Sequence, residues 1–269
     1  MKNFMNLPEQ LSNEENSKVE ILKVPYEETT SYGKGTKNAP CAIIEASNEL
    51  ESYDIETDSE PYKVGIYTKE ETDLTNIKPS QKFRIAIGGE HSITFNLIKN
   101  LNQNNLSILQ IDAHADLKNE FEGRKDSHAC VMRRIFEINN NITQVGIRSL
   151  DQEEVNFIQE NKIKTFFMKN IREDWIQKVL ETLTDKVYIT IDMDGFDPTV
   201  IPAVGTPEPN GLQYNQVYSL LREVFNKKEV VGMDFVELMP KEGDLVSPYT
   251  TAKLIYQSIA LKMRKENWL

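Results

Sequence analysis

Short apolar segments recur along the chain, and they predict the strands of a buried sheet. Each segment is four to seven residues long, is rich in valine, isoleucine and leucine, and shows little alternation between apolar and polar positions. Strands of this kind are covered on both faces, as in a parallel sheet with helices on either side. The predicted strands are 19–24, 83–87, 106–111, 142–147, 164–167, 187–191 and 230–236.

Helical patterns lie between these strands, with apolar residues recurring every three or four positions. Asp151 predicts the start of one helix, because Glu154 stands three residues later, as in a capping box. The other predicted helices are 40–50, 92–101, 129–138, 175–183, 217–225 and 248–264. The alternation of strands and helices predicts a three-layer α/β/α fold with a mainly parallel, doubly wound sheet. We expect one domain over 1–269, in which 1–18 form a peripheral N-terminal segment.

Composition narrows the classes of partner. The chain has 269 residues, 39% of them hydrophobic, which is enough for a sizeable core, and a formal net charge of −11, which disfavours nucleic acid. No apolar stretch has the length of a membrane span, and the first residues lack the apolar run of a signal peptide. The two cysteines, Cys41 and Cys130, form no Cys-x-x-Cys pair. We therefore expect a cytoplasmic protein without a membrane partner.

Imidazole and carboxylate side chains stand at the ends of four predicted strands. The carboxyl ends of parallel strands meet at one edge of a sheet, and ligands collect there. Within 112–116 and 192–194 the carboxylates and the imidazole stand two residues apart, so in extended backbone they point the same way. The residues expected to converge are His91, Asp112, His114, Asp116, Asp192, Asp194 and Glu237.

Six of these residues predict a metal centre. Two imidazoles and four carboxylates, without thiolate, suit Mn²⁺ and also Fe²⁺, Ni²⁺, Co²⁺ or Zn²⁺. Two divalent ions would balance four carboxylates, whereas one ion would leave uncompensated charge in a partly desolvated cleft. A pair of ions would also lower the pKa of a water between them and make it a nucleophile near neutral pH. The pattern therefore predicts a hydrolytic enzyme with two metal ions.

The segments that carry these residues resemble, in order, the signatures of the arginase/agmatinase (ureohydrolase) family. Further similar segments lie at 24–26, 35–40 and 145–148, so the resemblance covers nearly the whole chain. The segments with the strongest resemblance are Gly88-Gly89-Glu90-His91-Ser92, Asp112-Ala113-His114-Ala115-Asp116, Ser127-His128, Asp192-Met193-Asp194-Gly195-Phe196-Asp197-Pro198 and Asp234-Phe235-Val236-Glu237.

The resemblance implies an arginase-like fold, two Mn²⁺ per subunit and a role for each site residue. One ion would be held by His91 and Asp116, and the other by His114 and Asp194. Asp112 and Asp192 would bridge the two ions. Glu237 would bind the guanidinium nitrogens of a small cationic substrate, and His128 would carry the proton that the leaving amine needs. The products would be urea and an amine, and the assembly would be a homo-oligomer, a trimer or hexamer.

The residues near His128 bear on which guanidino compound is cleaved. Arginases have an Asn at the position of Lys118, so arginine is disfavoured, and Ser127-His128 is closest to agmatinases although Ala129 replaces their usual Gly. We expect agmatine, cleaved to putrescine and urea. Glu120 or Glu122 could pair with its second cation; alternatively, Lys118, Arg124 and Lys125 could receive the carboxylate of guanidinobutyrate or formiminoglutamate. Guanidinobutyrase, formiminoglutamase and arginase activities thus remain alternatives.

Two other classes are open. A deacetylase of similar architecture would use one zinc ion and would not need Asp116, Asp192 and Asp194 together. A catalytically silent family member would act by binding alone, but every expected ligand and both catalytic positions are present, which argues against it.

Five neighbouring features receive plainer interpretations. Glu90 is expected to support His91, Asp234 to be structural and Asp197 to form a turn. Cys130 is expected to pack in the core rather than to pair with His128. The proline-rich segment 198–209 could be a stiff wall of the active-site mouth or a surface loop.

Overall fold

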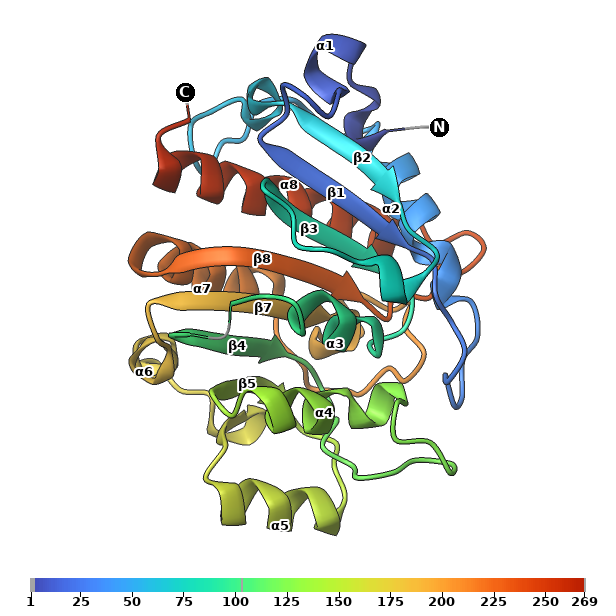
Figure 1. Ribbon diagram of the computed structural model, residues 1–269, viewed down its shortest axis with the longest axis vertical. Helices are drawn as coiled ribbons and strands as arrows, with labels where there is room; N and C mark the ends of the chain where they lie inside the picture. The colour runs from blue at the N-terminus through green and yellow to red at the C-terminus, as the bar shows by residue number, and fades with distance from the viewer. Residues whose placement is uncertain (1–2, 103, 269) are drawn as a thin grey trace.

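In the computed structural model, which describes residues 3–102 and 104–268, one parallel sheet runs through the centre of the molecule (Figure 1). Its eight strands lie in the order β2-β1-β3-β8-β7-β4-β5-β6, and every neighbouring pair is parallel. The strands are β1 (Val19–Val24), β2 (Ile66–Glu70), β3 (Phe83–Gly88), β4 (Leu106–Ile111), β5 (Ile142–Ile147), β6 (Lys164–Phe167), β7 (Lys186–Asp192) and β8 (Glu229–Val236).

Helices cover both faces of the sheet, so the strands separate two hydrophobic clusters. In β4, for example, Leu106 and Ile108 belong to one cluster, and Leu109 and Ile111 belong to the other. One face carries α2 (Ala39–Ser47), α6 (Trp175–Thr182), α7 (Tyr214–Lys227) and α8 (Val246–Glu266). The opposite face carries α3 (Ile93–Ile98), α4 (Val131–Ile138) and α5 (Gln152–Asn161). In Figure 1, α3 and α4 lie in front of the sheet and α5 lies at the lower end of the molecule.

The predicted fold class is confirmed, and the seven predicted strands are found to within one residue at each end. The capping box at the start of α5 is also present, with Asp151 accepting from the backbone of Glu154. Sequence analysis missed β2, an edge strand in which only Ile66 is buried and which ends in Thr-Lys-Glu. Such a segment has no apolar run, and it becomes a strand because its backbone pairs with β1.

The order in which the chain visits the strands brings four functional loops together. From β3 the chain passes over the positions of β8 and β7 to form β4, and it later returns to fill the gap. The four central strands β3, β8, β7 and β4 are therefore neighbours, and the loops after their carboxyl ends share one edge of the sheet.

The segment before β1 packs on the β2 edge of the molecule. It contains the short helix α1 (Glu9–Ser12), and the side chain of Phe4 is fully buried in the larger hydrophobic cluster. The backbone N–H of Phe4 donates to Thr68 of β2 at 3.0 Å. Among the described helices, none is both long and apolar enough to cross a membrane.

Candidate metal centre and active site

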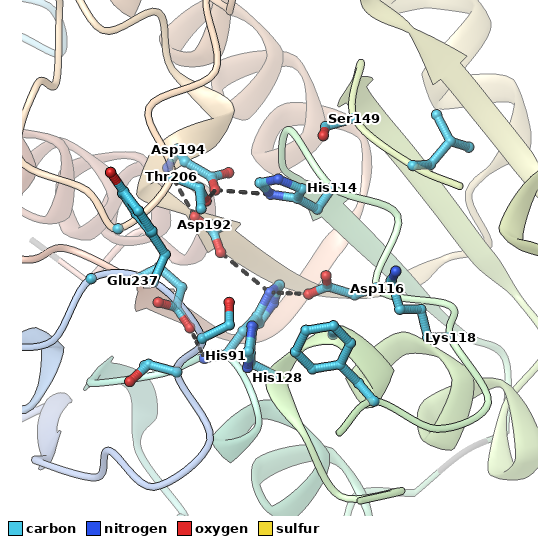
Figure 2. Close-up of a pocket in the computed structure, with 18 of the residues that line it drawn as sticks. His91, His114, Asp116, Lys118, His128, Ser149, Asp192, Asp194, Thr206 and Glu237 are labelled. Atoms are coloured by element: carbon cyan, nitrogen blue, oxygen red, sulfur yellow. Dashed lines mark hydrogen bonds and ion pairs between the residues drawn. The ribbon is translucent and has the colours of Figure 1, made fainter. Parts of the chain in front are cut away.

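The loops at this edge surround a cavity of about 260 Å³, which contains the residues singled out from the sequence (Figure 2). His91 follows β3, Asp192 ends β7 and Glu237 follows β8. Asp112 follows β4 and lies fully buried beneath the cavity. The other seven predicted site residues line it directly: His91, His114, Asp116, His128, Asp192, Asp194 and Glu237.

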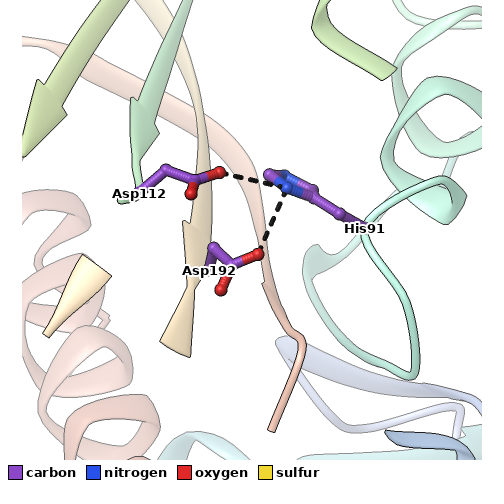
Figure 3. A group of neighbouring side chains, drawn as sticks. All are labelled: His91, Asp112 and Asp192. Atoms are coloured by element: carbon purple, nitrogen blue, oxygen red, sulfur yellow. Dashed lines mark ion pairs between the residues drawn. The ribbon is translucent and has the colours of Figure 1, made fainter. Parts of the chain in front are cut away.

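The first cluster of ligand atoms surrounds the fully buried imidazole of His91 (Figure 3). Its Nδ1 lies 3.0 Å from Asp116 Oδ2, 3.2 Å from Asp112 Oδ2 and 3.5 Å from Asp192 Oδ2. Three carboxylate oxygens and one imidazole nitrogen therefore face the same point. The ligand atoms of His91, Asp112 and Asp192 all lie within 4.8 Å of one another, close enough to hold one metal ion.

The second cluster lies beside the first and is more exposed. His114 Nδ1 is 3.0 Å from Asp194 Oδ2 and 3.8 Å from Asp112 Oδ1. These three residues form the second group that could hold a metal ion. Asp112 belongs to both groups and turns one carboxylate oxygen toward each histidine, which is the arrangement that a bridging ligand needs.

A buried ligand atom that lacks a hydrogen-bond partner indicates whether these residues fit metal ions. His91 Nδ1 is buried and has no hydrogen-bond donor or acceptor partner among the described residues, although buried polar atoms are normally paired. Nitrogen and carboxylate oxygen without sulfur match Mn²⁺ and similar divalent ions. The donor set therefore fits a pair of divalent cations.

Electrostatics in the metal-free chain lead to the same conclusion. Burial, with the charges of Asp116 and Asp194, raises the pKa of Asp112 to about 7. Burial also raises the pKa of Asp192, with Asp194 and Asp112 adding to the effect. At His114 burial would lower the pKa, but Asp194 and Asp112 outweigh it and raise the pKa to about 11. The crowding of negative charge thus favours the protonated forms of these carboxylates and histidines. Bound cations would replace those protons.

Unusual backbone geometry holds two of the site residues. Asp116 and Glu237 have φ angles of 53° and 63°, in the left-handed region that residues other than glycine rarely adopt. Gly195 lets the β7 loop approach β4 closely, since a Cβ there would lie 2.9 Å from the backbone nitrogen of Asp112. Replacing this glycine would push the loop of Asp192 and Asp194 away from Asp112.

His128 and Glu237 line the same cavity as the expected metal ligands. Glu237 is buried, and its Oε1 accepts the backbone N–H of His91 at 2.6 Å, which leaves Oε2 for other partners. Burial raises the pKa of Glu237 to about 8 in the metal-free chain. His128 lies in the short helix η5 (His128–Cys130), with its ring edge-on to Phe121 at 5.8 Å between centroids.

Supporting hydrogen bonds around the site were mostly not predicted. Glu90 supports the 27–30 loop rather than the ring of His91: it accepts from the backbone and hydroxyl of Thr29, whose hydroxyl lies 3.3 Å from His128 Nδ1. Gln110 donates to Asp112 Oδ2 at 2.7 Å. Thr29 lies in the loop after β1 and carries no recognisable signal, whereas Gln110 lies inside β4 and could have been indicated only by its spacing of two residues from Asp112.

Arg148 holds the loop after β7 in place, and sequence analysis did not predict this role. Its guanidinium donates to the backbone carbonyls of Asp194, Phe196 and Glu208, and to three more. It thereby joins the β7 loop to the proline-rich segment 198–209. Gly205 and Thr206 of that segment line the cavity, and Thr206 donates to Asp194 Oδ2, so the segment forms a wall of this cavity.

The remaining minor predictions have clear structural counterparts. Asp197 accepts from the backbone N–H groups of Thr199 and Gly211 and so forms a turn. Cys130 is fully buried, and burial raises its pKa to about 11, which makes it a poor nucleophile. Asp234 is fully buried and hydrogen-bonded to Tyr188 and Thr190.

The outer part of the cavity contains both signs of charge. Lys118 donates to Asp151 at 2.6 Å, and both residues line the cavity together with Glu154. Glu120 and Glu122, which were considered as partners for a second cation, are exposed and are not among the residues that line this cavity. Of the acidic groups beside Lys118, Asp151 is exposed, whereas Glu154 is buried and accepts from the backbone N–H groups of Leu117 and Asp151.

Comparison with known proteins agrees with this geometry. Residues 17–260 match the family model described as the arginase family. N(1)-aminopropylagmatine ureohydrolase of Synechocystis sp. is 39% identical over 266 residues, covering 89% of this chain and 87% of the relative. Agmatinase of Pyrococcus horikoshii is 32% identical, covering 91% of this chain and 92% of the relative.

Solved structures give the same result. Agmatine ureohydrolase of Thermoplasma volcanium superposes with a TM-score of 0.88 at 30% identity, covering 99% of this chain and 96% of that one. Arginase from Medicago truncatula superposes with a TM-score of 0.78 at 26% identity, covering 92% of this chain and 88% of that one. The chain therefore belongs to the arginase family of ureohydrolases, which its strand-end motifs resemble.

Proposed function

We propose that this chain hydrolyses a linear guanidinoalkylamine to urea and the corresponding amine, using two Mn²⁺ ions held by the six clustered ligands. The observation that carries the proposal is the pair of adjoining His/Asp clusters that share Asp112, at the base of a cavity lined by Glu237 and His128. The balanced reaction adds the oxygen of water to the guanidinium carbon and breaks the bond from that carbon to the substituted nitrogen. Both protons of the water end on that nitrogen, so the products are neutral urea and an alkylammonium ion.

The roles of the chain's own residues follow from charge and position. Glu237 provides a carboxylate oxygen for the guanidinium, a charge-assisted contact that also orients the planar group. His128 also lines the cavity, where its imidazole can deliver a proton to the departing amine, which cannot leave as an anion. Two divalent ions, when bound, would supply the Lewis acidity that ionises water near neutral pH.

The length and charge of the substrate tail are inferred from the relatives and from the outer cavity. Relatives that carry the name N(1)-aminopropylagmatine ureohydrolase are 39% and 37% identical to this chain, and the agmatinase of Pyrococcus horikoshii is 32% identical. Asp151 is exposed and lines the cavity, so a cationic tail would find a carboxylate there once it competes with Lys118. We therefore propose agmatine as a substrate and its N1-aminopropyl derivative as a better one.

A panel of substrates tests this proposal. The full-length protein would be loaded with Mn²⁺ and given agmatine, N1-aminopropylagmatine, arginine, guanidinobutyrate and formiminoglutamate, with detection of urea and formamide. We expect urea from the two alkylamines, with the higher kcat/KM for the aminopropyl compound. Urea from arginine or guanidinobutyrate alone, or formamide alone, would overturn the assignment of the tail.

The same preparation separates the two other classes of function. Two ions per chain with release of urea would support the proposal. One tightly held zinc ion per chain would favour a deacetylase, and two bound ions without turnover of any compound would favour a silent family member.

A further inference from the structure

A chain of buried hydrogen bonds lies behind His91, on the side away from the other ligands. His91 Nε2 is 2.8 Å from the hydroxyl of Thr190, and that hydroxyl is 2.6 Å from Asp234 Oδ1. The second oxygen of Asp234 accepts from the hydroxyl of Tyr188 at 2.9 Å. His91, Thr190 and Asp234 are fully buried, and Tyr188 is almost so.

The direction of each hydrogen bond follows from the number of protons available. A carboxylate only accepts, so Tyr188 and Thr190 both donate to Asp234. Thr190 has one hydroxyl proton, which is used in that bond, so its oxygen must accept from His91 Nε2–H. A neutral imidazole that is protonated at Nε2 carries its lone pair on Nδ1. That nitrogen faces Asp112, Asp116 and Asp192 and lacks a hydrogen-bond partner.

We propose that Asp234 is a positioning residue which, through Thr190, fixes His91 in the tautomer whose Nδ1 can bind a metal ion. The inference rests on the proposed metal site but is independent of the substrate. It extends the structural role expected of Asp234 from its sequence position, because it assigns the carboxylate a defined effect on metal binding. Outer hydrogen-bond partners of this kind orient metal-binding histidines and set their protonation.

The substitution Asp234→Asn reverses the direction of the chain with little change in shape. The Asn carbonyl oxygen would accept from Tyr188, and its NH₂ group would donate to Thr190. Thr190 would then donate to His91 Nε2, which moves the imidazole proton to Nδ1, where it competes with the metal. We expect Mn²⁺ affinity to fall about 10- to 100-fold, measured on full-length protein by the electron paramagnetic resonance signal of free Mn²⁺.

Variants of Thr190 distinguish this mechanism from a general packing effect. Thr190→Ser keeps the hydroxyl and should bind Mn²⁺ within about threefold of the wild type, whereas Thr190→Val should lose about as much affinity as Asp234→Asn. In the Thr190→Val background, Asp234→Asn should cost nothing further, because the connection is already broken. Thr143→Val is a matched control, since Thr143 is also a buried strand threonine bonded to another hydroxyl, that of Thr182, outside the site.

Several results would overturn the proposal: wild-type affinity in Thr190→Val, additive losses in the double variant, or an equal loss in Thr143→Val. Circular dichroism would confirm folding, and if Asp234→Asn failed to fold, the Thr190→Ser and Thr190→Val pair would still decide the matter. These measurements need no turnover, so a negative urea assay would leave them intact, and a failure here would leave the urea assay valid.

A spectroscopic measurement checks the tautomer directly. The chain has three histidines, so ¹⁵N-histidine spectra of the Zn²⁺-loaded protein are simple to assign. We expect a slowly exchanging Nε2–H signal from buried His91 in the wild type and in Thr190→Ser, and its loss or rapid exchange in Thr190→Val. A wild-type His91 that carried its proton on Nδ1 would refute the proposal.

Discussion

Among the three histidines, His128 has surroundings unlike those of the predicted metal ligands. The Nδ1 atoms of His91 and His114 face carboxylates, whereas His128 Nδ1 is near the hydroxyls of Thr29 and Ser127. Hydroxyl groups can accept from an imidazole N–H and leave the other ring nitrogen free to exchange a proton in the cavity. The partners of His128 therefore favour a role in proton transfer, whereas those of His91 and His114 favour metal binding.

Replacing His128 with Ala should therefore slow turnover without loss of metal. Loss of a general acid typically costs about 100- to 10,000-fold in rate, and we expect kcat to fall within that range. Metal analysis should still find two Mn²⁺ per chain, with affinity close to that of the wild type. Loss of metal from His128→Ala would mean that its assigned role is wrong.

Lys118 offers a test of the sign of charge on the substrate tail. Its ammonium is paired with Asp151 at the outer end of the cavity, so Lys118→Met would remove a positive charge and release a carboxylate. For agmatine or its aminopropyl derivative we expect KM to fall about two- to fivefold, as for one partly exposed charge interaction. A rise in KM for these compounds, or a loss of activity on guanidinobutyrate, would instead indicate an anionic tail.

The chemistry of individual ligands could be predicted from sequence, but the partners of those ligands could not. Asp112, His114 and Asp116 are recognisable because metal ligands recur at a spacing of two residues after a buried strand. Thr29 and Thr190 act only through contacts with residues 44 to 99 positions away in the sequence. Nothing in their local sequence distinguishes them from ordinary polar positions.

At the level of elements, the loop after β7 is held by a side chain from another strand. Arg148 follows β5, yet it satisfies carbonyl groups of the β7 loop and of the 198–209 wall. The guanidinium offers five N–H donors in a fixed plane, so one residue can satisfy several carbonyls that diverge from one another. Burial lowers the pKa of Arg148, with nearby carboxylates opposing that effect, and the group remains charged.

Arg148→Lys should loosen this loop, because an ammonium has fewer donors and no planar spread. Several carbonyls would lose their partners, and we expect the free energy of unfolding to fall by about 2–4 kcal/mol. Because Asp194 belongs to the same loop, Mn²⁺ affinity should also fall. Urea-induced unfolding with Mn²⁺ titration measures both effects; an unchanged midpoint of unfolding would refute the assigned role.

The position of a strand in the sheet determines whether it could be predicted from the sequence. Central strands such as β4 are buried at every position and mostly apolar, because helices cover both faces, and this pattern is local. Edge strand β2 has one exposed side and obtains its conformation from pairing with β1, so its own composition reveals little. The loop that carries Lys118 and His128 likewise takes its shape from distant contacts, such as that of Leu117 with Glu154.

For the whole molecule, the decisive quantity is the balance of charge at the base of the cavity. The chain carries a net charge of −11, and the site concentrates four ligand carboxylates and Glu237 in a small buried volume. Such a concentration opposes folding unless protons or cations neutralise it. Metal binding, proton binding and stability should therefore be linked in this protein.

The pH dependence of that linkage has a definite sign. In the metal-free chain, burial raises the pKa of Asp112 to about 7 and that of Glu237 to about 8, above their values in the unfolded chain. Between about pH 4 and pH 8 the folded state thus binds more protons than the unfolded state, and metal-free stability falls as pH rises. His114, with a raised pKa of about 11, adds a loss of the same sign above about pH 6.5.

Mn²⁺ should reverse this trend, because the ions bind the deprotonated carboxylates and neutral imidazoles and compete with protons for them. We expect the stabilisation by Mn²⁺ to be small at pH 5.5 and to grow to about 3 kcal/mol at pH 8 when the ion is present at a hundred times its dissociation constant. Thermal unfolding of chelator-treated protein, with and without Mn²⁺ at each pH, measures the difference. Equal stabilisation at both pH values would show that protons and metal do not share these ligands, and it would contradict the proposed centre.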